Sequence, residues 1–71
     1  MREYAVVFEK TSTGWSAYVP DLPGLGVAGA TYETTEQLIR EGIVFHIEGL
    51  IADGEAVPEA TTRVAQLPIS A

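Results

Sequence analysis

Apolar and polar residues alternate with the period of β-strands in the first part of the chain. In residues 2–9, β-branched and aromatic side chains occupy both sides of the alternation, which predicts a strand buried on both faces. A polar cluster that ends at Gly14 separates this strand from residues 15–19, where the period of two resumes. The two strands are therefore expected to form a hairpin. Residues 25–30 predict a short third strand, which its glycines weaken.

A turn is predicted between the second strand and the third. Pro20 lacks a backbone donor and ends the hydrogen-bonded ladder, and each residue of the Asp-Leu-Pro-Gly segment at 21–24 favours a turn. We expect residues 20–24 to form a rigid turn at the edge of the sheet. Large side chains are expected to lie near it: Trp15, Tyr18 and Leu22.

A single long helix is predicted in the middle of the chain. Thr31 is suited to cap its N-terminus, and Glu33 places negative charge at the positive end of the helix dipole. The helical pattern continues from Tyr32 to about Ala52, and Gly54 follows its end. At about 100° per residue, one apolar stripe is expected to pack on the sheet. It comprises Ile39, Gly42, Ile43, His46 and Leu50.

The pattern returns to a period of two after the helix. Residues 62–67 predict a fourth short strand that ends at Pro68. The expected order of elements is β-β-β-α-β, an α+β fold in which an antiparallel sheet packs on one long helix. With 71 residues the chain is expected to form a single domain over residues 1–71, without a C-terminal DNA-binding domain.

A second apolar stripe on the helix is left without a partner by this arrangement. Val44, Ile47 and Ile51 lie about 100° or more away from the stripe that faces the sheet. A domain this small has a marginal core, so we expect self-association, as a dimer or tetramer, to bury them. The alternative is that the C-terminal residues fold back over this stripe within one chain. The side chains that would then supply the cover are Val64, Leu67 and Ile69.

Composition and charge narrow the possible partners. Hydrophobic residues make up 46% of the chain and charged residues 20%, which is typical of a folded domain. Ten acidic side chains against four basic ones give a net charge of -6, which disfavours direct DNA or RNA binding and suits a basic protein partner. No apolar stretch reaches the roughly 20 residues of a membrane span. We therefore expect no membrane association and a cytoplasmic location.

Residue types that carry chemistry are scarce. The chain has no cysteine and one histidine, His46, which lies on the packing stripe and is expected to be a core or interface residue. The helical glutamates spread around the surface rather than onto one catalytic face. We expect no enzyme activity, no metal and no cofactor.

An ordered series of motifs runs from about Tyr4 to Pro58. It comprises Gly-Trp-x-Ala-Tyr-Val-Pro-Asp-Leu-Pro-Gly at residues 14–24, Gly29-x-Thr31, Ile43 and His46-Ile47-Glu48-x-Leu50 within the helix, then Gly54 and Pro58. In this series the chain resembles the HicB-like antitoxin family. The most specific part is the strand that ends in Pro-Asp-Leu-Pro-Gly, followed at the right distance by the Gly-x-Thr entry to the helix.

The resemblance implies a partial RNase H-like fold and a role in a toxin–antitoxin system. Family members bind a small basic toxin of the HicA type, which cleaves mRNA, and inhibit it by covering its active site. Many carry a C-terminal DNA-binding domain, which this sequence does not contain, so DNA binding is not expected. A nuclease of this fold would need metal-binding carboxylates in the middle of its first strand, where Val6 and Val7 stand here.

The sequence therefore predicts a protein-binding module that neutralises a toxin by contact. Its candidate partner-binding residues are Trp15, Tyr18, Asp21 and Leu22. Simple core packing is the competing interpretation, above all for Trp15. The alternative function is a stand-alone, self-associating structural or ligand-sensing domain without a toxin partner.

Overall fold

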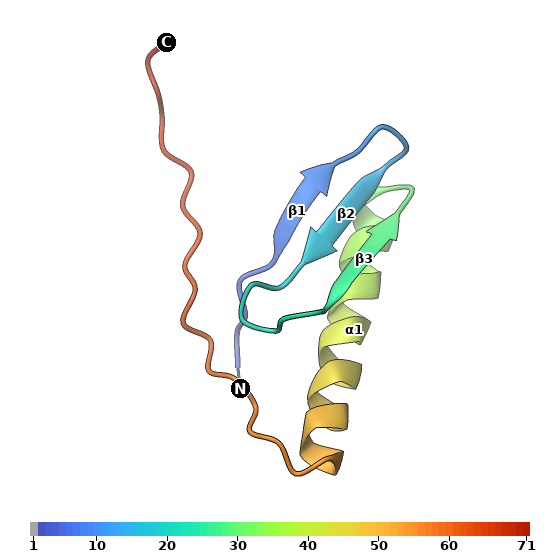
Figure 1. The fold of residues 1–71 in the computed structure, drawn as a ribbon. Coiled ribbons are helices and arrows are strands. Elements are labelled where there is room, and N and C mark those ends of the chain that lie inside the picture. Colours follow the sequence, from blue (N-terminus) through green and yellow to red (C-terminus); the bar gives the residue numbers. More distant parts are fainter. Residues whose placement is uncertain (1) are drawn as a thin grey trace.

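Three strands and one helix form the fold in the computed structural model, which describes residues 2–71. The strands are β1 (Val7–Lys10), β2 (Trp15–Tyr18) and β3 (Gly26–Gly29), and the helix is α1 (Tyr32–Ala52). The strands form one antiparallel sheet in the order β1-β2-β3, and α1 packs on a single face of it (Figure 1). The α+β class, the hairpin and the long helix are confirmed.

The register of the sheet places one row of side chains beneath the helix. Phe8 pairs with Ala17, which pairs in turn with Val27, so these three side chains lie on the same face. Phe8 and Val27 are partly buried and pack against the core. The buried core itself comprises Ala17, Val19, Leu22 and Ile39. Burying a Leu or Ile side chain contributes roughly 1.5–3 kcal/mol, so this small cluster is the main apolar support of the fold.

The helix begins and ends where the sequence predicts. The Thr31 hydroxyl accepts a hydrogen bond from the Thr34 amide at 3.1 Å, which satisfies a free N–H group of the first turn. The buried Thr35 hydroxyl donates to the Thr31 carbonyl at 2.8 Å, and a Cβ added to Gly29 would lie 2.6 Å from that hydroxyl oxygen. A glycine at position 29 therefore lets β3 approach the helix closely. Gly54 follows the helix with a φ of 72°, the left-handed conformation expected after a helix end.

The predicted packing stripe of α1 faces the sheet. Ile39 is buried and Ile43 packs against the core. A Cβ added to Gly42 would lie only 3.1 Å from the side chain of Leu25, so this glycine admits the connection between β2 and β3. The stripe continues as half-buried residues toward the helix end, at His46 and Leu50.

The first strand is shorter than predicted, and only one of its faces is covered. Strand pairing begins at Val7, although Tyr4 and Val6 before it still pack against the core. Within residues 2–71, no element covers the face of the sheet opposite α1, where Tyr18 is 43% exposed beside Val7. The prediction of a strand buried on both faces is therefore wrong. The apolar residues on the second side of the alternation border an open surface instead of a second layer.

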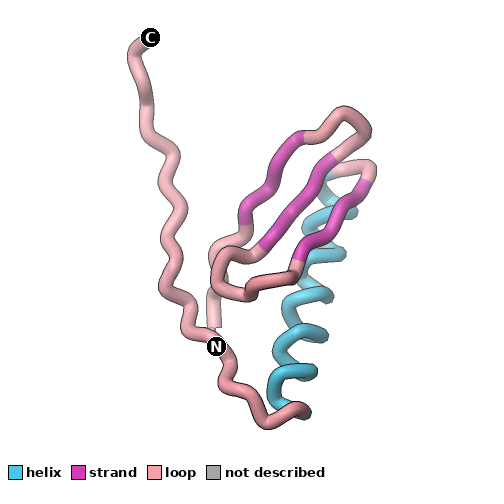
Figure 2. The backbone as a smooth tube through the Cα atoms, in the orientation of Figure 1, coloured by secondary structure: helices cyan, strands magenta, loops and turns pink. Residues whose placement is uncertain are grey.

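The predicted fourth strand is absent, and the observed order over residues 2–71 is β-β-β-α. Residues 55–71, which we name the C-terminal segment, run as extended chain past the β1 side of the sheet without joining it (Figure 2). Alternation makes a strand only where a neighbouring backbone accepts its hydrogen bonds, and no backbone among the described residues pairs with this segment. Its apolar side chains are exposed: Val64 by 61%, Leu67 by 74% and Ile69 by 79%. The segment therefore does not cover the second stripe of the helix.

Candidate protein-binding surfaces

The predicted partner-binding residues do not share one surface. Trp15 lies on the helix-facing side of the sheet, where its ring meets that of Tyr32 edge-on at 5.4 Å between centroids. The Lys10 ammonium lies 5.4 Å from the centre of the same indole. Trp15 is half-buried by these neighbours and lies outside the buried core of the fold.

Tyr18 lies on the opposite, open face. It pairs with Val7 on one side and with Gly26 on the other, so its ring has little bulk around it. Its exposed fraction of 43% leaves part of the ring accessible on a flat surface. Of the four predicted residues, Tyr18 is therefore the one whose side chain offers the largest contact area to a partner.

Leu22 is a core residue. The turn predicted at residues 20–24 forms, with the Leu22 amide donating to the Val19 carbonyl at 3.0 Å and Gly24 at a φ of 88°. This turn directs the Leu22 side chain inward, where its exposed fraction is 0%. A partner cannot touch a side chain in that position without opening the core, so Leu22 is excluded from the candidate surface.

Asp21 binds the C-terminal segment of its own chain. Its Oδ2 atom accepts hydrogen bonds from the backbone amides of Thr61 and Thr62, each at 3.0 Å. Its Oδ1 atom accepts from the two threonine hydroxyls, at 3.3 Å and 2.7 Å respectively. The Thr62 amide, followed by the Thr62 hydroxyl, holds the pKa of Asp21 below its ordinary value of 3.8, because these donors favour the charged carboxylate.

A second contact fixes the same segment nearby. The Tyr4 hydroxyl donates a hydrogen bond to the Pro58 carbonyl at 2.6 Å. Sequence reasoning missed both anchors, since residues 40 or more positions apart have no shared local pattern. The one available signal was the pair Thr61-Thr62, whose adjacent hydroxyls and amides are suited to a carboxylate.

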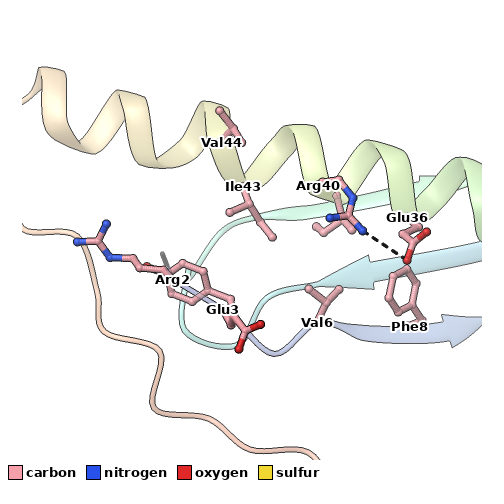
Figure 3. Close-up of a pocket in the computed structure, with 10 residues that line it drawn as sticks. Arg2, Glu3, Val6, Phe8, Glu36, Arg40, Ile43 and Val44 are labelled. Atoms are coloured by element: carbon pink, nitrogen blue, oxygen red, sulfur yellow. Dashed lines mark ion pairs between the residues drawn. The ribbon is translucent and has the colours of Figure 1, made fainter.

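A groove of about 470 Å³ lies between α1 and the β1 side of the sheet (Figure 3). We name it the β1–α1 groove. Its apolar lining comes from both elements and includes Val6, Phe8, Ile39 and Ile43. Its charged lining includes the exposed pair Arg40 and Glu36, whose side chains approach to 3.7 Å on the helix. Exposed pairs of this kind contribute little to stability, about 0–1 kcal/mol, so the rim is free to rearrange around an occupant.

The outer side of α1 carries exposed apolar residues. Val44 is 56% exposed and Ile51 62%, whereas Ile47 is half-buried. Phe45, at 79%, is more exposed than any of them, and sequence reasoning missed it because it belongs to neither predicted stripe. Phe45 and Val44 line a shallow hollow together with charged residues of the helix.

Residues 2–71 offer neither a metal site nor a membrane-spanning helix. In this range no cluster of three or more His, Asp or Glu side chains is arranged to hold a metal ion. No helix among these residues is both long enough and apolar enough to cross a membrane. The features that this part of the chain offers are the open sheet face, the β1–α1 groove and the outer side of α1.

Comparison with known proteins identifies the family. The model of the family described as HicB-like antitoxin of bacterial toxin-antitoxin systems matches residues 4–69. The chain belongs to the HicB-like antitoxin family. Membership links the chain to bacterial toxin–antitoxin systems in general. The family match also includes the C-terminal segment as far as residue 69, so this segment is part of the family's pattern.

Relatives of this HicB-like chain occur in a phage and in a cyanobacterium. It is 39% identical over 57 residues to an uncharacterized 14.9 kDa protein from the rep-hol intergenic region of Haemophilus phage HP1. That alignment covers 80% of this chain and 43% of the phage protein, so the chain spans less than half the length of that relative. It is also 39% identical over 67 residues to the UPF0150 protein ssr1765 of Synechocystis, covering 93% of this chain and 85% of the relative. No solved structure matches the chain, and the RNase H-like likeness stays a prediction.

Proposed function

We propose that this HicB-like protein binds and neutralises a small basic, mRNA-cleaving toxin of the HicA type by direct contact. The family match over residues 4–69 carries this proposal. The net charge of -6 supports it, because opposite potentials steer the encounter with a basic partner and disfavour binding to the RNA itself. A toxin that cleaves mRNA acts where mRNA is, so the proposed complex forms in the cytoplasm. The antitoxin supplies contact area and no cofactor.

We propose that the toxin contacts the open face of the sheet, around Tyr18. A tyrosine combines a rigid ring with a hydroxyl and loses little conformational freedom on binding. Val7 and Ser16 lie on the same face as Tyr18, and Glu9 adds an exposed carboxylate that suits a basic partner. A sheet face is rigid before binding, which lowers the entropic cost of association.

Two of the other predicted contacts are secondary in this proposal. The Trp15 ring is engaged by Tyr32, and the Asp21 carboxylate by the C-terminal segment. Each would reach a toxin only at the rim of the contact. We rank them below Tyr18 because rim residues contribute less binding energy than a central aromatic anchor.

Co-purification and a single substitution test the toxin contact. Tagged protein from its native cell should carry a small basic ribonuclease and inhibit its RNA cleavage at a stoichiometric ratio. Tyr18→Ala should weaken binding by about 2 kcal/mol, as expected for an aromatic anchor, which calorimetry with the purified pair would measure. Phe45→Ala is the matched control, because it removes an exposed aromatic ring from α1 instead of the sheet.

Two results would contradict the proposal. Absence of any small basic partner would favour the alternative of a self-associating structural or ligand-sensing domain. Unchanged toxin binding by Tyr18→Ala, with the fold intact by circular dichroism, would move the contact away from the open sheet face.

We also propose that the protein self-associates, as a dimer or tetramer, through the outer side of α1. Val44, Ile47 and Ile51 lie along this side, and Phe45 adjoins them. Burying each side chain is worth roughly 1.5–3 kcal/mol before the costs of association are subtracted. This surface is separate from the open sheet face, so self-association leaves Tyr18 available. Sedimentation at micromolar concentration tests it, since a species near 7.6 kDa would be a monomer.

A further inference from the structure

The edge of the sheet at β1 has no strand beside it within residues 2–71. β1 is the outer strand in the order β1-β2-β3, and α1 packs mainly on β3 and β2, meeting β1 through the rings of Tyr32 and Phe8 at 4.5 Å between centroids. The backbone N–H and C=O groups on this edge are therefore free to pair with another chain. The same edge borders the β1–α1 groove, whose lining from Val6, Phe8 and Ile43 is apolar. An extended chain with apolar residues on one side would satisfy both features.

The C-terminal segment is such a chain. Successive side chains of an extended segment point to opposite sides, so Ala65, Leu67 and Ile69 share one side. Leu67 and Ile69 are 74% and 79% exposed, with no apolar surface beneath them. Gln66 lies on the other side, together with Val64. The side with Ala65, Leu67 and Ile69 therefore matches an apolar groove, and Arg63 at its start suits the carboxylates in the groove lining, Glu3 and Glu36.

The proline in the segment fixes which backbone groups can pair. The N–H and C=O groups of one residue point to the same edge of a strand, and those of the next residue point to the other edge. Pro68 has no N–H, so the residues of even number must face away from a partner strand. Ala65 and Leu67 then face the partner with both of their backbone groups. This is the pairing that one neighbour on a single edge requires.

The segment is held so that it projects from its own chain. Hydrogen bonds from Tyr4 to Pro58, and from Thr61 and Thr62 to Asp21, fix residues 58–62. Beyond this point, residues 63–71 continue as extended chain on the β1 side of the sheet without pairing with it (Figure 1). At about 3.3 Å per residue, seven extended residues span roughly 23 Å, which exceeds the length of β1. The segment is therefore long enough to lie along the whole edge of another copy.

We propose that residues 63–69 of one copy pair as a strand with the β1 edge of a second copy, so that Leu67 and Ile69 enter its β1–α1 groove. The second copy returns the same contact, which gives a closed twofold dimer. The proposal rests on the self-association proposed above and identifies the segment that performs it. Val44 belongs to both the groove and the outer side of α1, so the exchanged strand and the helix contact form one continuous interface.

Neighbouring substitutions on opposite sides of the segment provide the first test. Leu67→Glu places a charge in the groove and should weaken dimerisation by about tenfold or more, measured by sedimentation over a dilution series. Gln66→Glu is the matched control, because it adds the same charge one residue away on the open side. Dimerisation should be unchanged in the control. Equal dissociation constants for the two variants would overturn the proposal.

Cross-linking distinguishes exchange between copies from folding back within one chain. The chain has no cysteine, so Glu3→Cys in the groove lining and Gln66→Cys in the segment create unique sites. When the two single variants are mixed, a short bis-maleimide should join one chain of each kind. If the double variant instead closes within single chains after dilution, the segment occupies its own groove and the proposal is overturned.

The helix variant Ile47→Glu distinguishes strand exchange from self-association through the outer side of α1. If Ile47→Glu dissociates the dimer while Leu67→Glu leaves it intact, the helix contact stands and strand exchange is overturned. If the wild-type protein is a monomer at micromolar concentration, both self-association and strand exchange are overturned. Toxin binding through Tyr18 is measured separately, so neither result decides it.

Discussion

β2 and the C-terminal segment both alternate apolar with polar residues, but they differ in what lies beside them. β2 has β1 on one side, β3 on the other and α1 above, and its Ala17 is 2% exposed. Within residues 2–71, the C-terminal segment has no strand on either side, and its Leu67 is 74% exposed. Alternation decides which side chains share a side, whereas neighbouring backbones and a covering layer decide whether a strand forms. A segment with a strand pattern but no neighbouring strand therefore marks backbone groups that are left without a pairing partner.

The largest expected effect comes from making the same substitution, leucine to alanine, in the core and in the C-terminal segment. Leu22→Ala should lower the free energy of unfolding by about 2–5 kcal/mol, because it leaves a cavity in a small core. Leu67→Ala, measured at a protein concentration where the chain is monomeric, should change the free energy of unfolding by less than about 0.5 kcal/mol. Urea denaturation measures both. Similar losses in the two variants would mean that the segment packs against its own chain.

A smaller and more local effect is expected at the carboxylate that holds the segment. Asp21→Asn removes the charge and substitutes an amide donor for one acceptor oxygen, so it cannot accept all four hydrogen bonds from Thr61 and Thr62. Hydrogen exchange at the two threonine amides should accelerate, while the midpoint of global unfolding stays nearly constant. Glu59→Gln, which removes an exposed carboxylate nearby, should leave that exchange unchanged.

The same contact should respond to acid. The pKa of Asp21 is lowered when the segment is attached, so attachment stabilises fully above the ordinary value of 3.8. It is lost as the pH falls below 3.8 through the lowered pKa, because the protonated carboxyl accepts these hydrogen bonds less well. Amide exchange at Thr61 and Thr62, compared with a core amide such as Ala17, would follow this release. Protection that persists unchanged to the lowest pH would show that Asp21 is not the anchor.

The sequence predicts well the parts of the fold that depend on local signals. The helix over Tyr32–Ala52 has its capping threonine before it and a glycine with positive φ after it, and both signals act within a few residues. The turn at residues 20–24 and the hairpin likewise follow from the types and spacing of neighbouring residues. The family resemblance rests on these same local motifs, which the match over residues 4–69 supports.

The parts that the sequence does not predict depend on distant partners. The predicted fourth strand is absent because no backbone within residues 2–71 pairs with it, although its residues alternate as those of β2 do. Leu22 and Tyr18 stand close together in the sequence, yet a single turn buries one and leaves the other on the open face. The bond between Asp21 and Thr62 spans 41 positions and has no local signature. Residues that are close in the sequence therefore predict a helix or turn more reliably than they predict a shared binding site.

The order of the elements along the chain also separates folding from assembly. Contacts within the sheet and helix are mostly between elements adjacent in the chain, which favours rapid folding of each copy. The bonds from Thr61 and Thr62 to Asp21 likewise form within one molecule. The proposed pairing of the C-terminal segment with the β1 edge of another copy instead requires two molecules to meet, so its rate depends on concentration. On this proposal, dilution slows assembly without slowing the folding of each copy.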